Sequence, residues 1–357
     1  MIDLKLYGYN ETETPPEGLL PGRITEHRGE HYTVITERGE ATAVLKGTFY
    51  HNADARADFP CVGDFVHLQY NDTGNSRIAA LLPRRTKFSR ADFSGHAAGY
   101  VKTILEQVVA ANFDYVFILS SLNWDFKVSR IIRYLTQTRQ SGAQPVVILT
   151  KADLADDFSA QLAEVRRAAP DVPVHAISAF TGFGFGALDE YFRPCKTAVF
   201  LGMSGVGKSS LLNALMEREV MAVKEMREDD SRGRHTTTHR QLFMLPGGAM
   251  VIDTPGMREL GLFGADEGIS AGFSDVEDFF AQCRYNDCRH KTEPGCAVLA
   301  ALAGGALTNE QWERYLAQKR ESKFVDDKTG YLTDKRARNK SIAMWSKQKK
   351  KTGGFKK

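Results

Sequence analysis

The amino-acid sequence predicts a multidomain protein with an N-terminal β-barrel, a central α/β domain and a C-terminal, mostly helical domain that binds metal. Three observations lead to this prediction. Short β-like runs separated by glycines fill residues 22–82, apolar strands alternate with helices over residues 115–252, and cysteines cluster with a histidine in residues 283–296. A chain of 357 residues that is 42% hydrophobic is long enough for two or three such domains.

The N-terminal domain is expected to be a small antiparallel barrel of about five strands, such as an OB-fold. Strands are predicted at residues 33–35, 42–45 and 64–68, and the runs are broken at Gly29, Gly39, Gly63 and Gly74. An SH3-like barrel would give much the same pattern, so alternation leaves both topologies open. We assign residues 1–88 to this domain, including an N-terminal extension and the basic stretch 84–90, whose simplest interpretation is a charged linker.

The central domain, residues 89–265, is predicted to contain a parallel sheet covered by helices on both faces. Near-continuous apolar strands that alternate with helices, such as the one expected at 127–140, are typical of that architecture. The strands are predicted at residues 115–119, 145–149, 174–177, 198–201, 241–245 and 249–252.

A phosphate-binding loop is predicted between the strand 198–201 and the helix 210–216, where residues 202–209 match G-x-x-x-x-G-K-S. Its glycines let backbone N–H groups turn toward phosphates, Lys208 reaches the β- and γ-oxygens, and Ser209 ligates Mg²⁺. The nucleotide-contacting residues expected here are Gly202, Ser204, Gly205, Val206, Gly207, Lys208, Ser209 and Ser210. ATPases and small-molecule kinases use the same loop, so it predicts only a nucleotide.

The base is predicted from two segments that each follow a strand. In Thr150-Lys151-Ala152-Asp153, the carboxylate can accept both the N1–H and the 2-amino group of guanine, which adenine does not offer. Thr150 stands where such segments usually carry Asn. The backbone of Ser178-Ala179 fits the segment that meets guanine O6. These segments indicate a guanine nucleotide.

The Mg²⁺ and γ-phosphate contacts are predicted from Asp253-Thr254-Pro255-Gly256. Asp253 is expected to hold Mg²⁺ through water, and the N–H of Gly256 to face the γ-phosphate. In the usual GTPase order the phosphate loop comes first, whereas here both base-reading segments precede it. The sequence therefore predicts a circularly permuted GTPase domain, which is tolerable because only the arrangement in space matters.

The catalytic residues are the least specific part of the prediction. Thr238, in a polar loop between the phosphate loop and Asp253, is the favoured switch ligand of Mg²⁺, although spacing does not distinguish it from neighbouring threonines. Many GTPases position water with a Gln where this chain has Met257, so intrinsic hydrolysis should be slow. Either His235 or His239 positions the attacking water, or a partner supplies the group that does so.

A closed, structural Zn²⁺ site is predicted in residues 266–330. Three thiolates and one imidazole lie in a short span with spacing x4, x and x5, at Cys283, Cys288, His290 and Cys296. The alternative is a set of buried cysteines with a chance histidine. The remaining thiols, Cys61 and Cys195, are expected to be buried hydrophobes in a reducing compartment.

Charge is distributed unevenly. Residues 335–357 carry ten Lys or Arg and no acid, which leaves 37 basic against 44 acidic residues in the rest of the chain. The basic tail, residues 331–357, is therefore either a solvated segment or an arm that meets nucleic acid. No apolar run approaches the length of a membrane span and no secretion signal is present, so we expect a cytoplasmic protein without membrane contact.

Motif order, the Gly233-Arg234-His235-Thr236-Thr237-Thr238 segment and the Cys/His spacing closely resemble one family, the ribosome small-subunit-dependent GTPases of GTPase A type, over roughly residues 20–325. The resemblance implies an OB-fold, a permuted GTPase domain and a domain with one structural Zn²⁺. It also implies GTP and GDP as ligands with Mg²⁺, and hydrolysis stimulated by the small ribosomal subunit late in its maturation. Contact with 16S rRNA and a monomeric state are expected too.

Two other functions are compatible with parts of the sequence. An RNA-binding adaptor could use GTP only as a structural ligand, and would show no subunit-stimulated turnover. A P-loop ATPase or kinase would keep its nucleotide preference in the variant Asp153→Asn.

Overall fold

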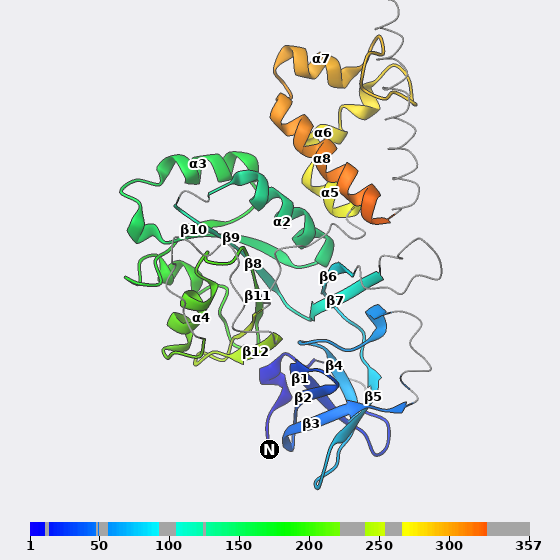
Figure 1. Ribbon diagram of the computed structural model, residues 1–357, viewed down its shortest axis with the longest axis vertical. Coiled ribbons are helices and arrows are strands. Elements are labelled where there is room, and N and C mark those ends of the chain that lie inside the picture. Colours follow the sequence, from blue (N-terminus) through cyan, green and yellow to red (C-terminus); the bar gives the residue numbers. More distant parts are fainter. Residues whose placement is uncertain are drawn as a thin grey trace, which may run out of the picture. The chain divides into compact units, whose positions relative to one another are not determined.

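The computed structural model describes residues 1–10, 14–47, 49, 56–92, 105–123, 126–221, 240–253 and 266–326 (Figure 1). The chain divides into two compact units. The first comprises Met1–Arg90, Glu106–Leu260 and Glu267–Ser274, and the second Ala91–Leu105, Gly261–Asp266 and Asp275–Lys357. Among the described helices, none has the length and apolar character needed to cross a membrane.

The N-terminal strands close into a five-stranded barrel. The strands are β1 (Leu20–Arg28), β2 (His31–Thr36), β3 (Gly39–Leu45), β4 (Phe65–Gln69) and β5 (Ser76–Leu81). Their order is β1-β2-β3-β5-β4, and pairing of β1 with β4 completes the circle. The β3–β5 pair is parallel while the other neighbours are antiparallel, which is the OB arrangement and decides against an SH3-like barrel. The core is apolar and includes Ile24, Val34, Ala43, Val66, Leu68 and Ile78. Short 3-10 helices η1 (Leu4–Tyr7) and η2 (Arg56–Asp58) accompany it.

The central domain is the predicted α/β sandwich. Its sheet runs in the order β10-β9-β8-β11-β13-β12, with every pair parallel except β12–β13. The strands are β8 (Tyr115–Ser121), β9 (Gln144–Thr150), β10 (Val174–Ala176), β11 (Thr197–Leu201), β12 (Arg240–Met244) and β13 (Met250–Asp253). All six lie within about two residues of the predicted strands.

Helices cover both faces of this sheet. Helices α2 (Val128–Ser141) and α3 (Ser159–Ala168) lie on one face and α4 (Lys208–Met216) on the other (Figure 1). Side chains of Phe117, Leu119 and Phe200 form one buried cluster with Leu211 and Leu212 of α4. Alternate residues of the same strands point to the opposite face, which is why these strands are apolar throughout.

The barrel and the central sheet are continuous. Strand β1 pairs with β12 at Glu26↔Gln241 and His27↔Arg240, so the two form one 11-stranded sheet. At this junction Arg23 is fully buried. Its guanidinium donates to the carbonyls of Tyr7, Gly63 and Asn112 and to Thr197 Oγ1, at 2.6, 3.3, 2.7 and 3.1 Å.

Burial lowers the pKa of Arg23 to about 9, so the side chain stays charged at neutral pH. A buried cation is stable only when its N–H groups have acceptors, and these acceptors come from both domains. Nothing in the sequence singled out Arg23, because one arginine in a β-like run has no distinguishing pattern.

The basic stretch 84–90 differs from the expected solvated linker. Arg84 makes a two-pronged ion pair with the buried carboxylate of Asp64, both N···O distances being 2.8 Å, and also donates to the carbonyls of Ala57 and Phe59. The following residues form β6 (Lys87–Asp92), which pairs with β7 (Leu105–Ala111). Planar guanidinium–carboxylate pairing explains why Arg84 is held against the barrel and is not a solvated linker residue.

The C-terminal region is helical, as predicted. Its elements are α5 (Asp266–Gly272), α6 (Ser274–Glu277), η6 (Phe280–Gln282), α7 (Ala297–Gly304) and α8 (Asn309–Asp326). A capping box precedes α8: Thr308 N–H donates to Gln311 Oε1 and Gln311 N–H to Thr308 Oγ1, each at 3.1 Å. Helix α5 is tied to α2, because Gly268 N–H donates to Gln140 Oε1 at 3.0 Å.

Candidate functional site

The predicted nucleotide-binding segments meet at one edge of the central sheet. Parallel strands end at the same edge, and β9, β10, β11 and β13 all belong to the parallel part of this sheet, in which β8 lies between β9 and β11. The chain leaves β9 at Thr150, β11 at Leu201 and β13 at Asp253. Segments that are out of order in the sequence are thus brought together in space, at the edge where such sheets bind ligands.

The phosphate loop has the backbone shape that its glycines permit. Gly202, Gly205 and Gly207 have φ of 155°, 79° and 98°, in the region that disfavours side chains. A Cβ on Gly202 would lie 2.7 Å from the carbonyl of Leu119, so only glycine fits. Val206 is buried in the core, while Ser204 and Gly205 are exposed.

Lys208 begins α4 and its amine lies back over the loop. The Nζ donates to the carbonyls of Gly202 and Met203 at 2.7 and 2.8 Å. Ser209 and Ser210 follow in the first helical turn and are half-buried. The N–H groups of that turn point out of the helix, which suits a phosphate and leaves Lys208 within reach of its oxygens.

Thr150 joins the base-reading segment to the phosphate loop. Its side chain is buried, and its hydroxyl donates to the carbonyl of Val206 at 2.5 Å. The sequence identified Thr150 only as a departure from Asn; the structure gives the hydroxyl a definite partner. The next residue, Lys151, has a φ of 62° and turns the chain so that Asp153 is exposed at the rim.

The Ser178-Ala179 turn is held by Ser178 itself. Ser178 is fully buried, its N–H donates to the carbonyl of Phe183, and its hydroxyl accepts the N–H groups of Phe180 and Thr181. Because the N–H of Ser178 is used within the loop, a contact from this turn to a base oxygen would have to come from another amide, such as that of Ala179. The turn abuts the other base-reading segment, since Ala152 N–H donates to the carbonyl of Ile177 at 3.1 Å.

Asp253 ends β13 as a buried carboxylate beside the strand that leads to the phosphate loop, in register with Phe200. That position suits a water-mediated metal ligand. The other predicted switch and catalytic positions lie outside the described residues: His235, Thr238, His239, Gly256 and Met257.

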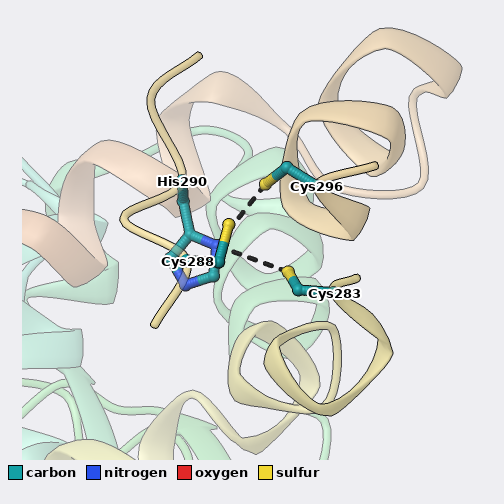
Figure 2. A group of neighbouring side chains, drawn as sticks. All are labelled: Cys283, Cys288, His290 and Cys296. Carbon is teal, nitrogen blue, oxygen red and sulfur yellow. Dashed lines mark hydrogen bonds between the residues drawn. The ribbon is translucent and has the colours of Figure 1, made fainter. Parts of the chain in front are cut away.

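The second candidate site is the Cys/His cluster. The ligand atoms of Cys283, Cys288, His290 and Cys296 all lie within 4.8 Å of one another. In Figure 2 dashed lines join the imidazole to two of the thiols, with His290 Nδ1 at 3.6 Å from Cys283 Sγ and 3.5 Å from Cys296 Sγ. This donor set could hold a metal ion.

Neighbouring groups fix the cluster. The ring of Phe280 stacks on His290 at 4.4 Å, and the carboxylate of Glu293 accepts the backbone N–H groups of Lys291 and Thr292 at 2.8 and 3.0 Å. Those N–H groups lower the pKa of Glu293 to about 2. Neither Phe280 nor Glu293 was anticipated, because spacing identifies ligands and not the residues that orient them.

The two other cysteines differ from each other. Cys61 is buried as expected, and burial raises the pKa of its thiol. Cys195 is only half-buried and has a φ of 66°, so its expectation as a buried hydrophobe is wrong.

A P-loop GTPase with permuted motifs, preceded by an OB-type barrel and followed by a helical Cys/His domain, is the class that this fold and these sites define. The chain belongs to the RsgA GTPase family, whose sequence model matches residues 81–263. It is 44% identical over 304 residues to "Small ribosomal subunit biogenesis GTPase RsgA 2" of Listeria monocytogenes, covering 85% of this chain and 84% of that protein.

Solved structures agree with the fold. YjeQ from Thermotoga maritima is 25% identical with a TM-score of 0.58, covering 84% of this chain and 96% of that one. A second structure, YloQ, described as a circularly permuted GTPase, is 21% identical with a TM-score of 0.54, covering 84% and 94% of the two chains. The predicted permuted GTPase fold is thereby confirmed.

Proposed function

We propose that this chain hydrolyses GTP in the biogenesis of the small ribosomal subunit, as the names of its relatives say of them. One observation carries the proposal. The base-reading segment and the phosphate loop, which lie apart in the sequence, are joined by the hydrogen bond from Thr150 to Val206. A nucleotide held by both would span this contact.

The phosphate end is proposed to use the loop 202–209. Lys208 exchanges its carbonyl acceptors for β- and γ-phosphate oxygens, a charge-assisted and therefore stronger bond. Ser209, Thr238 and Asp253 would hold Mg²⁺, which would supply positive charge beside the phosphate oxygens. The N–H of Gly256 is proposed to face the γ-phosphate, and His235 to orient the attacking water.

The base end is proposed to select guanine. Asp153 accepts two N–H groups that adenine lacks, and the N–H of Ala179 donates to O6. Exposure of Asp153 supports this role, because its carboxylate is accessible to a ligand. A carboxylate that pairs with both N–H groups of guanine discriminates bases strongly, since the wrong base leaves it unpaired.

The metal proposed for the Cys/His cluster is Zn²⁺. Zn–S and Zn–N bonds of about 2.3 and 2.0 Å in a tetrahedron separate S and N by about 3.5 Å. The two S···N distances, 3.6 and 3.5 Å, fit that requirement. Four protein ligands leave no place for water, so the ion is structural, one per chain.

The proposed binding partner is the 16S rRNA of the small ribosomal subunit. The OB-type barrel and the basic tail 331–357, which lies outside the described residues, support contact with phosphates and single strands. Truncation after residue 334 should weaken subunit binding and flatten its salt dependence. Unchanged affinity and slope would exclude the tail from the interface.

We also propose a division into residues 1–88, 89–265, 266–330 and 331–357, a monomeric state and a cytoplasmic location. Sedimentation of the purified chain tests the monomeric state, and fractionation of cells tests the cytoplasmic location.

GTP turnover with and without purified small subunits tests the activity. Stimulation by subunits, lost in Lys208→Ala, is the expected result. No stimulation together with unchanged GTP binding would favour the adaptor that uses GTP structurally. His235→Ala and His239→Ala then ask whether either histidine orients water: if both keep stimulated turnover, the catalytic group lies elsewhere in the chain or in the partner.

A further inference from the structure

Large apolar side chains gather on the two loops that are proposed to read the base. Leu154, Phe180 and Phe183 are 68%, 89% and 54% exposed. Leu154 directly follows Asp153, and Phe180 directly follows Ala179. Exposed apolar side chains that gather in one place on a folded domain mark a binding site more often than chance.

Phe180 is the most exposed member of this group, at 89% against 68% for Leu154 and 54% for Phe183. The ring of Phe183 lies 6.2 Å from that of Phe158, in a T-shaped contact that occupies it. Leu154 belongs to the 3-10 turn η3 (Ala152–Leu154). Phe180, at 89% exposure, presents nearly its whole ring at the rim of the site.

The loop that carries Phe180 is held firmly in place. The N–H of Phe180 donates to the buried hydroxyl of Ser178 at 3.2 Å. Gly184 closes the turn with a φ of 77° and packs so tightly that a Cβ there would lie 2.2 Å from the carbonyl of Ala176. An aromatic ring on a rigid support loses little conformational freedom when it binds.

We propose that the ring of Phe180 stacks on the face of the guanine base. This inference rests on the proposed function. Asp153 and Ala179 act at the edges of the base, within its plane, and so do not cover its faces. A phenyl ring supplies an apolar face, and stacking of this kind does not depend on which purine is present. Phe180 thus contributes affinity, while Asp153 contributes selectivity for guanine.

Nucleotide affinity of the full-length chain tests the proposal, with a fluorescent GDP displaced by GDP or IDP. Phe180→Ala should lower the affinity for GDP and for IDP by the same factor, at least about fivefold. Phe180→Trp should keep wild-type affinity, and its emission, taken as the difference from the wild type with its three tryptophans, should change as GDP binds. Phe183→Ala, exposed on the same loop, is the matched control and should stay within about twofold.

The outcomes separate the two claims. If the wild type binds GDP, and Phe180→Ala binds it within twofold while Phe180→Trp shows no change in emission, the stacking is overturned and the GTPase function stands. If the wild type binds no guanine nucleotide, both are overturned. A loss confined to GDP and absent for IDP would also contradict stacking, because it would indicate an edge contact.

Discussion

The hydroxyl of Thr150 donates to the carbonyl of Val206 across 2.5 Å, which ties the end of β9 to the phosphate loop. Both residues are buried, so this bond is shielded from water and its loss would leave a carbonyl unpaired. The position of the base-reading loop is therefore set directly by the phosphate loop. Thr150, which stands where Asn is usual, thus connects the two loops.

Removing the Thr150 hydroxyl should weaken GDP binding without unfolding the chain. Thr150→Val keeps the shape but loses one buried hydrogen bond, and we expect roughly a three- to tenfold loss of affinity. Thr150→Ser keeps a hydroxyl and should stay near the wild type. Equal affinities for the valine and serine variants in a fluorescent-GDP titration would show that the bond has no role.

Changing Asp153 should alter base choice. Asp153→Asn replaces one acceptor with a donor, so GDP affinity should fall by at least about a hundredfold and xanthosine diphosphate should now bind. Asp156→Asn, exposed in the same loop, is the control and should keep the preference for GDP. Retention of guanine selectivity by Asp153→Asn would show that Asp153 does not select the base.

Arg23→Lys should destabilise the barrel and the α/β domain together. An ammonium has three donors and no planar fork, so buried carbonyls of Tyr7, Gly63 and Asn112 lose partners, and a cost of about 2–4 kcal/mol is expected. Urea unfolding measures it. Arg28→Lys is the control, because the Arg28 side chain is 61% exposed, and its effect should stay within about 0.5 kcal/mol.

Removing the metal should affect the C-terminal unit selectively. Cys288→Ser, or treatment with a strong chelator, should eliminate the bound ion and reduce helical circular dichroism, since metal binding and folding are coupled in small modules. Cys195→Ser leaves the cluster intact and should retain one ion per chain by mass spectrometry. Undiminished helicity after complete loss of the ion would show that the helices α6 to α8 are stable alone.

The architecture was largely predictable from the sequence because it depends on period and order. Strands buried on both faces are apolar throughout, and glycines, Lys208 and Asp153 stand at spacings that only their chemistry explains. The barrel topology was not predictable, since alternation does not specify which strands pair. The parallel β3–β5 ladder decided it.

The residues that support the fold and the Cys/His cluster could not be predicted from the sequence, for a different reason. Arg23, Arg84 and Glu293 act through partners far away in the chain or through backbone N–H groups, and neither leaves a pattern in the order of residues. Arg84 illustrates this: a run of basic residues is usually solvated, and only the buried Asp64 makes this one structural.

Because β1 pairs with β12, the barrel is part of the same sheet as the central domain and is not an independent module. Excising it would turn β12 into an open sheet edge, where stray strands can add and aggregates begin. It would also strip Asn112 and Thr197 of the guanidinium that they bind. Truncation or gene fusion at residue 88 should therefore destabilise the α/β domain, which would not be so if a flexible linker joined the two domains. The barrel and the nucleotide-binding sheet are expected to occur together in evolution.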